Sequence, residues 1–414
     1  MLAITSIICS AHLVDRALLE LCGFSAGDTT EVDCALYLCS DIRNMQMKQR
    51  ADFMVTFIIG NGFDLRVGLN TRYTDFYKVY TKFKNGDSKT IKRFKEEILK
   101  SESHNWKNWS DFERQMGIHS NEFQGDTPVE DFIECFNDFV VSFNGYLAEE
   151  CENIDWQSIN TATIQNFMHS ITSFYTHITR VGHGEVQSRI GVRKAVNFLQ
   201  FNYTDAFDKL LDKSNLKNLK NTIPSGHVGI GSLGKNLHIH GKLGKGGYMT
   251  MGVDEEKQIK NAKMSNDPRM QMLFIKPMFL DALQARNVNR EIMREEALRQ
   301  ITSSSVICSY GSSIGDTDGY WWLKIGDWLK NSHGTFIIFD VCGAEDDGIS
   351  PLAFLNSELS IDDRKKEITE RFLRLAMLNE DWVNMNPNRL IIELDTKMFN
   401  FKLPRLKTAQ TGDQ

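Results

Sequence analysis

The stretch Val55-Thr56-Phe57-Ile58-Ile59, followed at once by Gly60-Asn61-Gly62-Phe63-Asp64-Leu65, decides the fold of this chain. A short apolar run rich in β-branched residues is typical of a parallel strand that is covered on both faces. Two glycines at its end allow a tight turn into a helix, whose first amides attract anionic oxygens. The dinucleotide fingerprint G-x-G-x-x-G is incomplete, because Leu65 replaces the third glycine. The stretch therefore indicates either a nucleotide site or an ordinary tight turn.

Further strand-like runs follow at long intervals along the chain. They are Ala195–Phe201, Leu237–His240, Ser305–Ser309, Thr335–Asp340 and Arg389–Leu394. Apolar residues at helical spacing lie between the first two runs, as at Phe132, Phe136 and Phe139. These patterns predict an α/β fold with a Rossmann-like, mostly parallel sheet over residues 54–400. A large helical insertion is expected at about residues 84–190, packed over the ligand crevice.

The two ends of the chain differ in composition from the rest. Residues 1–53 hold four of the eight cysteines and have no basic segment before their apolar start, which argues against a secretory signal. We expect an N-terminal extension, either a mis-assigned start before Met45, Met47 or Met54, or a small helical decoration. Residues 401–414 are expected to form a polar tail.

Composition narrows the class of function. The net charge of −6 and the pI of about 6.0 argue against a nucleic-acid binder that relies on phosphate contacts. The exception would be a local patch made by Lys209, Lys213, Lys217 and Lys220. No apolar run approaches the roughly 20 residues that cross a bilayer, and the cysteines have no zinc-ligand spacing. We expect a cytoplasmic protein with reduced cysteines, no membrane contact and no metal.

Polar residues follow three of the predicted strands. The segments are Asn202-Tyr203-Thr204-Asp205, His240-Gly241-Lys242 and Tyr310-Gly311-Ser312-Ser313 through Asp318. A single residue of this kind often only caps a helix or forms a turn. The carboxyl ends of parallel strands, however, meet at one ligand crevice. An amide can orient water or a ribose hydroxyl, and a histidine can take a proton near neutral pH. We therefore predict that Asn202 and His240 meet near the Gly60–Gly62 turn.

These segments resemble the AbiH family of phage abortive-infection proteins over about residues 54–345. The opening signature is similar to Phe57 through Leu65 together with Gly68-Leu69-Asn70-Thr71-Arg72-Tyr73-Thr74-Asp75-Phe76. Later blocks of the family are similar, in the expected order, to Trp109 through Glu113, Phe201 through Asp205, His238 through Gly241 and Tyr310 through Asp318. That family is similar in turn to the sirtuin-like NAD-consuming domains of bacterial antiphage systems. The chain lacks the paired zinc cysteines of sirtuin deacetylases, so lysine deacetylation is disfavoured.

The resemblance implies a sirtuin-like fold and an antiphage effector that hydrolyses NAD to nicotinamide and ADP-ribose. It implies that His240 is the general base and that Asn202 positions water or ribose. NAD is the implied substrate, and no metal is implied. The residues implied to hold it are Gly60, Asn61, Gly62, Phe63, Asp64, Asp205, Gly311, Ser312, Asp316 and Asp318.

Other interpretations of the same residues stay open. One alternative is a sensor or scaffold that binds NAD or ADP-ribose without turnover, and another is a transferase or nuclease on the same fold. The binding partners left open are a phage-derived trigger and further copies of this chain in a homo-oligomer. Trp109, Asp111 and Glu113 are either buried supports or a lid over the nicotinamide.

Overall fold

The computed structural model describes residues 53–104, 106–107, 111–179, 186, 193–214, 216, 229–244, 248–277, 291–341, 361–394 and 396–406. The N-terminal extension therefore lies outside the described residues, apart from Phe53 at the start of the first strand. Trp109 lies outside them as well, and so do Lys217 and Lys220 of the lysine cluster.

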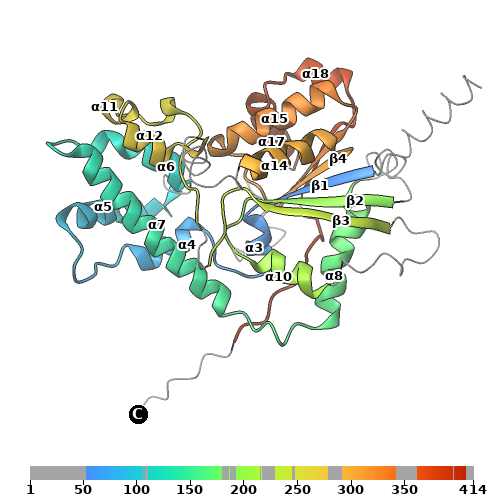
Figure 1. Cartoon of the computed structure of the whole chain (residues 1–414), viewed down its shortest axis with the longest axis horizontal. Helices are drawn as coiled ribbons and strands as arrows, with labels where there is room; N and C mark the ends of the chain where they lie inside the picture. The colour runs from blue at the N-terminus through green and yellow to red at the C-terminus, as the bar shows by residue number, and fades with distance from the viewer. Residues whose placement is uncertain are drawn as a thin grey trace, which may run out of the picture. The chain divides into compact units, whose positions relative to one another are not determined.

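Six parallel strands form the centre of the fold (Figure 1). They are β1 (Phe53–Ile59), β2 (Arg193–Gln200), β3 (Gly229–His238), β4 (Val306–Tyr310), β5 (Thr335–Asp340) and β6 (Leu390–Leu394). Their order is β3-β2-β1-β4-β5-β6, and every pair is parallel. This order is that of doubly wound, dinucleotide-binding sheets, in which the ligand crevice lies where the order reverses. The predicted α/β fold is confirmed. The predicted run Leu237–His240 supplies only the last two residues of β3, and the other predicted runs coincide closely with strands.

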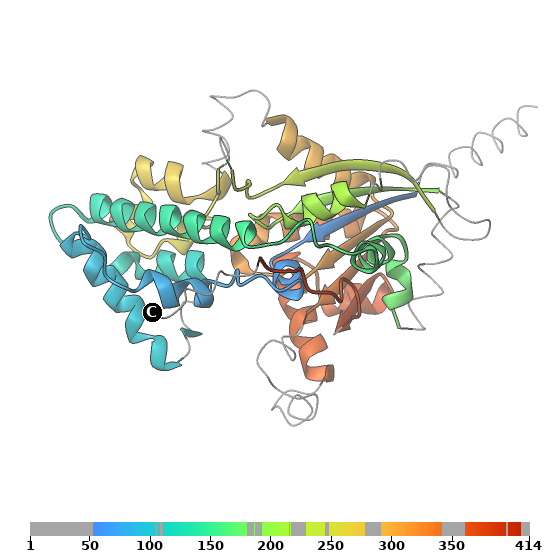
Figure 2. The ribbon, with the colours of Figure 1, turned by 90° about the horizontal axis from the view of Figure 1, so that it is seen from below.

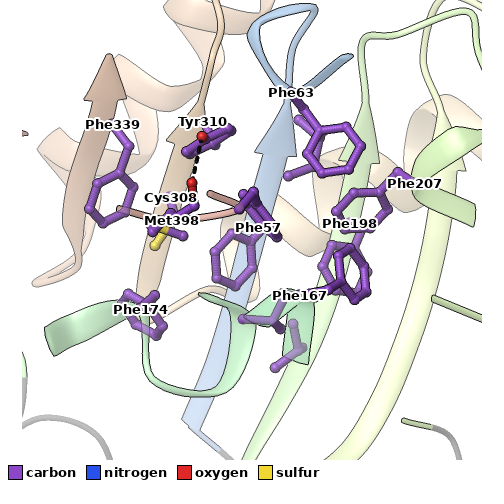
Figure 3. Close-up of a cluster of buried hydrophobic side chains, with 14 of the residues drawn as sticks. Phe57, Phe63, Phe167, Phe174, Phe198, Phe207, Cys308, Tyr310, Phe339 and Met398 are labelled. Carbon is purple, nitrogen blue, oxygen red and sulfur yellow. Dashed lines mark hydrogen bonds between the residues drawn. The ribbon is translucent and has the colours of Figure 1, made fainter. Parts of the chain in front are cut away.

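Alternating side chains along β1 explain why both faces of the sheet are covered. Phe57 and Ile59 point into one hydrophobic core, and Ile58 points into the other. Figure 3 shows the first core, where Phe57 packs between aromatic side chains and the Tyr310 hydroxyl donates to the Met398 carbonyl at 2.9 Å. Burying one such side chain contributes about 1.5–3 kcal/mol. The two cores together fix β1 as the central strand.

Helices cover the two faces in different ways. The first face packs against α8 (Thr161–Thr172), α10 (Ala206–Lys213) and the chain around Phe399. The opposite face packs against α14 (Glu291–Ser303), α15 (Gly319–Asn331) and α17 (Ile361–Leu375), with Trp322 fully buried between them. The short helix α3 (Gly62–Arg66) follows β1, and the short helix α18 (Glu380–Met385) precedes β6.

A third core holds a cluster of helices at the carboxyl ends of the strands (Figures 1 and 2). The cluster contains α4 (Tyr73–Tyr80), α5 (Lys89–Lys100), α6 (Phe112–His119), α7 (Pro128–Glu152), α11 (Ala262–Ser265) and α12 (Pro268–Phe274). Phe274 packs edge-on against Phe132 and Phe136 of α7. The cluster thus differs in extent from the expected insertion at residues 84–190, because it recruits residues 249–275 while α8 packs on the sheet.

The chain after β6 is tied to the body of the fold. Residues 401–406, where we expected a polar tail to begin, include the buried Leu403, whose amide donates to the Val67 carbonyl at 2.9 Å. Arg405 donates to Gly68 O at 2.7 Å and pairs with Glu150. Residues 407–414 lie outside the described residues. None of the described helices combines the length and apolar character needed to span a membrane.

Candidate functional site

A cleft of about 820 Å³ lies at the carboxyl ends of the strands. It is lined by the turn after β1, by Asn202 after β2, by His240 after β3 and by residues 311–318 after β4. Residues of the helical cluster and of α17 complete its walls. Its volume falls within the range of about 300–1,000 Å³ that small-molecule sites occupy. The structure thus brings Asn202, His240 and the Gly60–Gly62 turn to one cleft, as predicted from their places at strand ends.

The turns after β1 and β4 pack backbone against backbone at the point where the strand order reverses. Gly60 N donates to Tyr310 O at 2.9 Å, and Gly62 N donates to Gly311 O at 2.8 Å. A Cβ on Gly62 would lie 2.5 Å from Gly311 Cα, and Gly311 has a φ of +66°. The expectation that the Gly60 and Gly62 amides hold a pyrophosphate is therefore corrected, because both N–H groups already have carbonyl partners.

Asn61 and Asp64 lie on the same turn but have different surroundings. Asn61 Oδ1 accepts from Thr71 Oγ1 at 2.6 Å, so this side chain holds the segment that leads into α4. Asp64 is buried at the cleft wall, where Oδ2 accepts from Thr204 Oγ1 at 2.8 Å and no described residue bonds Oδ1. Burial raises the pKa of Asp64 to about 7, against the opposing effects of Thr204 and the neighbouring Asn202. Asp64 therefore changes its protonation state near neutral pH.

Two residues expected to contact the ligand do not line the cleft. The Phe63 ring lies in the first core, with centroids 5.1 Å from those of Phe207 and Phe399 (Figure 3). Asp205 pairs with Lys209 one helical turn later, at 3.0 Å between Oδ1 and Nζ. Successive residues of a helix point about 100° apart, so Asp64 faces the cleft while Phe63 faces the core. Placement at a strand end thus did not determine the direction of each side chain.

His240 is held by hydrogen bonding at one ring nitrogen. Its Nδ1 lies 3.2 Å from the Phe201 carbonyl, which only accepts, so Nδ1 carries a proton. Nε2 lies 2.9 Å from Asp318 Oδ1, which is ion-pair distance, but without the alignment of a hydrogen bond. Such a carboxylate stabilises the imidazolium that forms when the histidine takes a proton.

Lys276 is a residue beside the site that sequence reasoning missed, and the cleft-lining Arg371 and Arg374 are two more. Its Nζ is buried and lies 3.0 Å from Asp318 Oδ1, 3.1 Å from Glu113 Oε2 and 2.7 Å from the Thr317 carbonyl. Burial alone would lower the pKa of Lys276, but Asp318 and Glu113 raise it well above its usual range. Although burial by itself raises the pKa of Asp318, Lys276 and His240 hold it well below its usual range. The signal in the sequence was a lone lysine inside the apolar run that begins at Leu273.

The two acidic residues whose roles were left open now have distinct surroundings. Glu113 is a buried partner of Lys276, and burial raises its pKa. The Tyr203 hydroxyl lies 3.4 Å from Glu113 Oε1 and donates to the Thr250 carbonyl at 3.2 Å. Asp111 accepts from the Arg114 amide at 3.0 Å and so caps α6, while also lining the cleft. Glu113 is therefore a buried support that reaches the cleft wall.

Several buried polar atoms of the cleft lack partners among the described residues. They are Asp64 Oδ1, both amide atoms of Asn202 and Oγ of Ser312. Folded proteins leave few buried polar groups unpaired, so several on one cleft indicate groups that a ligand or water completes. In the same wall, Ile314 has a φ of 49°, which is strained for a β-branched residue and is a feature of functional loops.

The rim of the cleft carries arginines from several elements. Arg374 donates to Asp316 Oδ1 at 2.7 Å, and Arg371 donates to the Ser313 carbonyl at 3.1 Å. Arg72 and Arg114 line the cleft as well. Within the described part of the chain, no group of acidic, histidine or cysteine side chains is arranged to hold a metal ion. The absence of a metal stays a prediction.

The fold and the site together define an α/β protein of the doubly wound class, with a ligand cleft where the strand order reverses. A family model described as bacteriophage abortive infection AbiH matches residues 56–340, well over half of the 414 residues. The chain belongs to the AbiH family of bacteriophage abortive-infection proteins. The match begins in β1 and ends with β5, so it includes the segments that line the cleft after β1, β2, β3 and β4. A comparison with curated proteins gave no match.

Proposed function

We propose that this abortive-infection protein is an effector that hydrolyses NAD to nicotinamide and ADP-ribose in the cleft. The observation that supports this most is the meeting of His240 with the Asn202 amide and the Asp64 carboxyl in one cavity, where both Asn202 amide atoms and Asp64 Oδ1 have no partner among the described residues. A base, a positioning amide and a carboxyl near a cationic sugar are the groups that this reaction needs.

In the proposed reaction, the bond between the nicotinamide nitrogen and ribose C1′ breaks, and its electron pair leaves with nicotinamide. Positive charge then develops on the ribose, and the oxygen of a water molecule bonds to C1′. Nε2 of His240 takes the proton that this water loses, a role that is worth about 10²–10⁴-fold in rate. The imidazolium faces Asp318, which stays ionised beside Lys276.

Asn202 and Asp64 have complementary parts in this proposal. Because both amide atoms of Asn202 are unpaired, the side chain can bond the attacking water and a ribose hydroxyl together. Ionised Asp64 lies in a buried wall, where a carboxylate stabilises a cationic sugar more than it would in water. NAD as substrate, a phage-derived trigger, self-association and a cytoplasmic location are predictions that go with this function.

A second candidate function is binding without turnover. It is favoured by the burial of the proposed reacting groups, since Asn202 is 3% exposed and His240 is 6% exposed. A cleft that shields these side chains gives substrate little access in the described conformation. A sensor or scaffold for NAD or ADP-ribose fits this feature, and so does an effector that opens only when triggered.

The test is to incubate the purified full chain with NAD and to separate the products by chromatography. We expect wild type to form nicotinamide and ADP-ribose in equal amounts. Asn202→Ala and His240→Ala should form neither product, and His104→Ala should form both as wild type does. His104 is a matched control, because it is an exposed histidine that does not line the cleft. Binding of NAD without products would favour the sensor, and ADP-ribose attached to protein would favour a transferase.

A further inference from the structure

Four backbone amides of the turn after β1 already have carbonyl partners, so they offer no donor to an anionic ligand in this cleft. Besides the Gly60 and Gly62 amides, Phe63 N donates to Gly60 O at 2.9 Å and Leu65 N donates to Asn61 O at 3.1 Å. These backbone donors are already paired. Side chains of the cleft wall can supply the positive charge that a phosphate-bearing ligand needs, and Arg72, Arg114, Arg371 and Arg374 line the cleft.

Two of these arginines come from one face of α17. Arg371 and Arg374 are three residues apart, a spacing that places helical side chains next to each other. Both reach the loop that follows β4, where Arg371 donates to the Ser313 carbonyl and Arg374 donates to Asp316. The Ser312 hydroxyl of this loop is buried, lines the cleft and has no partner among the described residues. Two guanidinium groups and a hydroxyl thus border the same wall.

Both guanidinium groups keep donors for a ligand. Each has five N–H groups, and the bonds of Arg374 use only its Nη1. Arg371 uses Nη1 for Ser313 and Nη2 for Glu367. Planar guanidinium groups bind phosphate oxygens in bidentate fashion, which makes arginine well suited to this ligand class.

We propose that Arg371, Arg374 and the Ser312 hydroxyl form the subsite for the diphosphate of a nucleoside diphosphate ligand. This inference rests on the proposed function, since NAD and ADP-ribose both carry a diphosphate. It adds two residues that lie beyond the matched residues 56–340. It also replaces the backbone amides of the glycine turn with side chains of α17 as the phosphate contacts.

The ion pair between Arg374 and Asp316 means that the Asp316 carboxylate competes with a ligand phosphate for the Arg374 guanidinium. Their side chains are 59% and 40% exposed, and exposed ion pairs are weak. An incoming phosphate therefore replaces the Asp316 carboxylate at small cost. Removing the competing charge with Asp316→Asn should strengthen diphosphate binding, an effect opposite in sign to that of removing either arginine.

The test is calorimetric titration of the full chain with ADP and with adenosine. We expect wild type to bind ADP more tightly than adenosine, and Arg374→Gln and Arg371→Gln each to weaken ADP binding about tenfold, as for the loss of one charge-assisted hydrogen bond. Adenosine binding should not change, and Asp316→Asn should bind ADP more tightly than wild type. Arg299→Gln is the matched control, because Arg299 is 62% exposed and pairs with Glu296 at 2.7 Å.

Several outcomes would overturn this subsite whether or not NAD is hydrolysed. They are ADP affinity unchanged in both arginine variants, an equal loss of ADP and adenosine affinity, and no preference of wild type for ADP. If instead ADP binding depends on the arginines while no NAD is consumed, the subsite stands and the hydrolase proposal fails. Melting temperatures of the variants separate a lost contact from a lost fold.

Discussion

Nε2 of His240 lies 2.9 Å from Oδ1 of Asp318, and the same oxygen lies 3.0 Å from the buried ammonium of Lys276. Asp318 therefore connects the proposed base to the positive charge of Lys276. Because its pKa is held far below neutral, the carboxylate is ionised whenever His240 takes up a proton. The surroundings of His240 are thus built by residues from two distant parts of the chain.

Lys276→Met should strongly destabilise the fold. Removing one partner of a buried ionic network leaves the Glu113 and Asp318 charges uncompensated, which typically costs about 3–5 kcal/mol. Lys242→Met is the control, since Lys242 pairs with Asp208 at 3.1 Å but is 38% exposed, and exposed pairs contribute about 0–1 kcal/mol. Urea unfolding of both variants measures the difference. Equal losses of free energy would show that the Lys276 network is not the buried support described here.

Asp64→Asn should change how stability depends on pH. The pKa of Asp64 is about 7 in the folded chain against 3.8 for the ordinary group, so the unfolded chain releases this proton at lower pH. As pH rises from about 4 to 7, the wild type therefore loses stability, by at most about 4 kcal/mol at 1.36 kcal/mol per pKa unit.

The asparagine does not titrate, so the variant avoids this loss. Melting temperatures at pH 5 and pH 8 provide the measurement. Relative to wild type, Asp64→Asn should be more stable at pH 8 than at pH 5. A difference between the two proteins that stays constant across this range would contradict the burial and raised pKa of Asp64.

Gly62→Ala should damage the fold rather than only a ligand contact. The new Cβ would lie 2.5 Å from Gly311 Cα and 2.9 Å from its carbonyl oxygen, so the two turns must separate. Overpacking of this kind costs about 1–3 kcal/mol or more. Gly145→Ala in α7 is the matched control, because its Cβ would meet nothing within 4 Å and alanine favours a helix interior by about 0.5–1 kcal/mol. Thermal unfolding should thus move in opposite directions for the two variants, and an unharmed Gly62→Ala would refute the close packing of the turns.

The elements that sequence reasoning located are those with local signals. β1, β2, β4, β5 and β6 coincide with apolar runs, whereas most of β3 lies before the predicted run. Asn202 and His240 each stand two residues after the end of a strand, so parallel topology was enough to bring them to one cleft. The hydrogen bond from the Gly62 amide to the Gly311 carbonyl was not predictable in this way. It depends on β4 lying beside β1, a long-range pairing that no local pattern in the sequence indicates.

The remaining differences have the same physical origin. Lys276 gains its role from Glu113 and Asp318, which reach it from distant parts of the chain, and a lone lysine carries no motif. Phe63 and Asp64 are neighbours in sequence, but the short helix α3 turns one to the core and the other to the cleft. Long-range aromatic packing also joins Phe274 to α7, which extends the helical cluster beyond the expected residues.

The most direct test of the central claim is the amount of NAD in phage-infected cells that carry wild type, Asn202→Ala or His240→Ala. With the proposed chemistry, NAD falls and nicotinamide rises after infection only with wild type, and phage protection is lost in both variants. Melting temperatures close to that of wild type would show that the variants lose chemistry and not the fold. Equal NAD depletion in folded His240→Ala and wild type, or phage protection by wild type at unchanged NAD, would contradict the account.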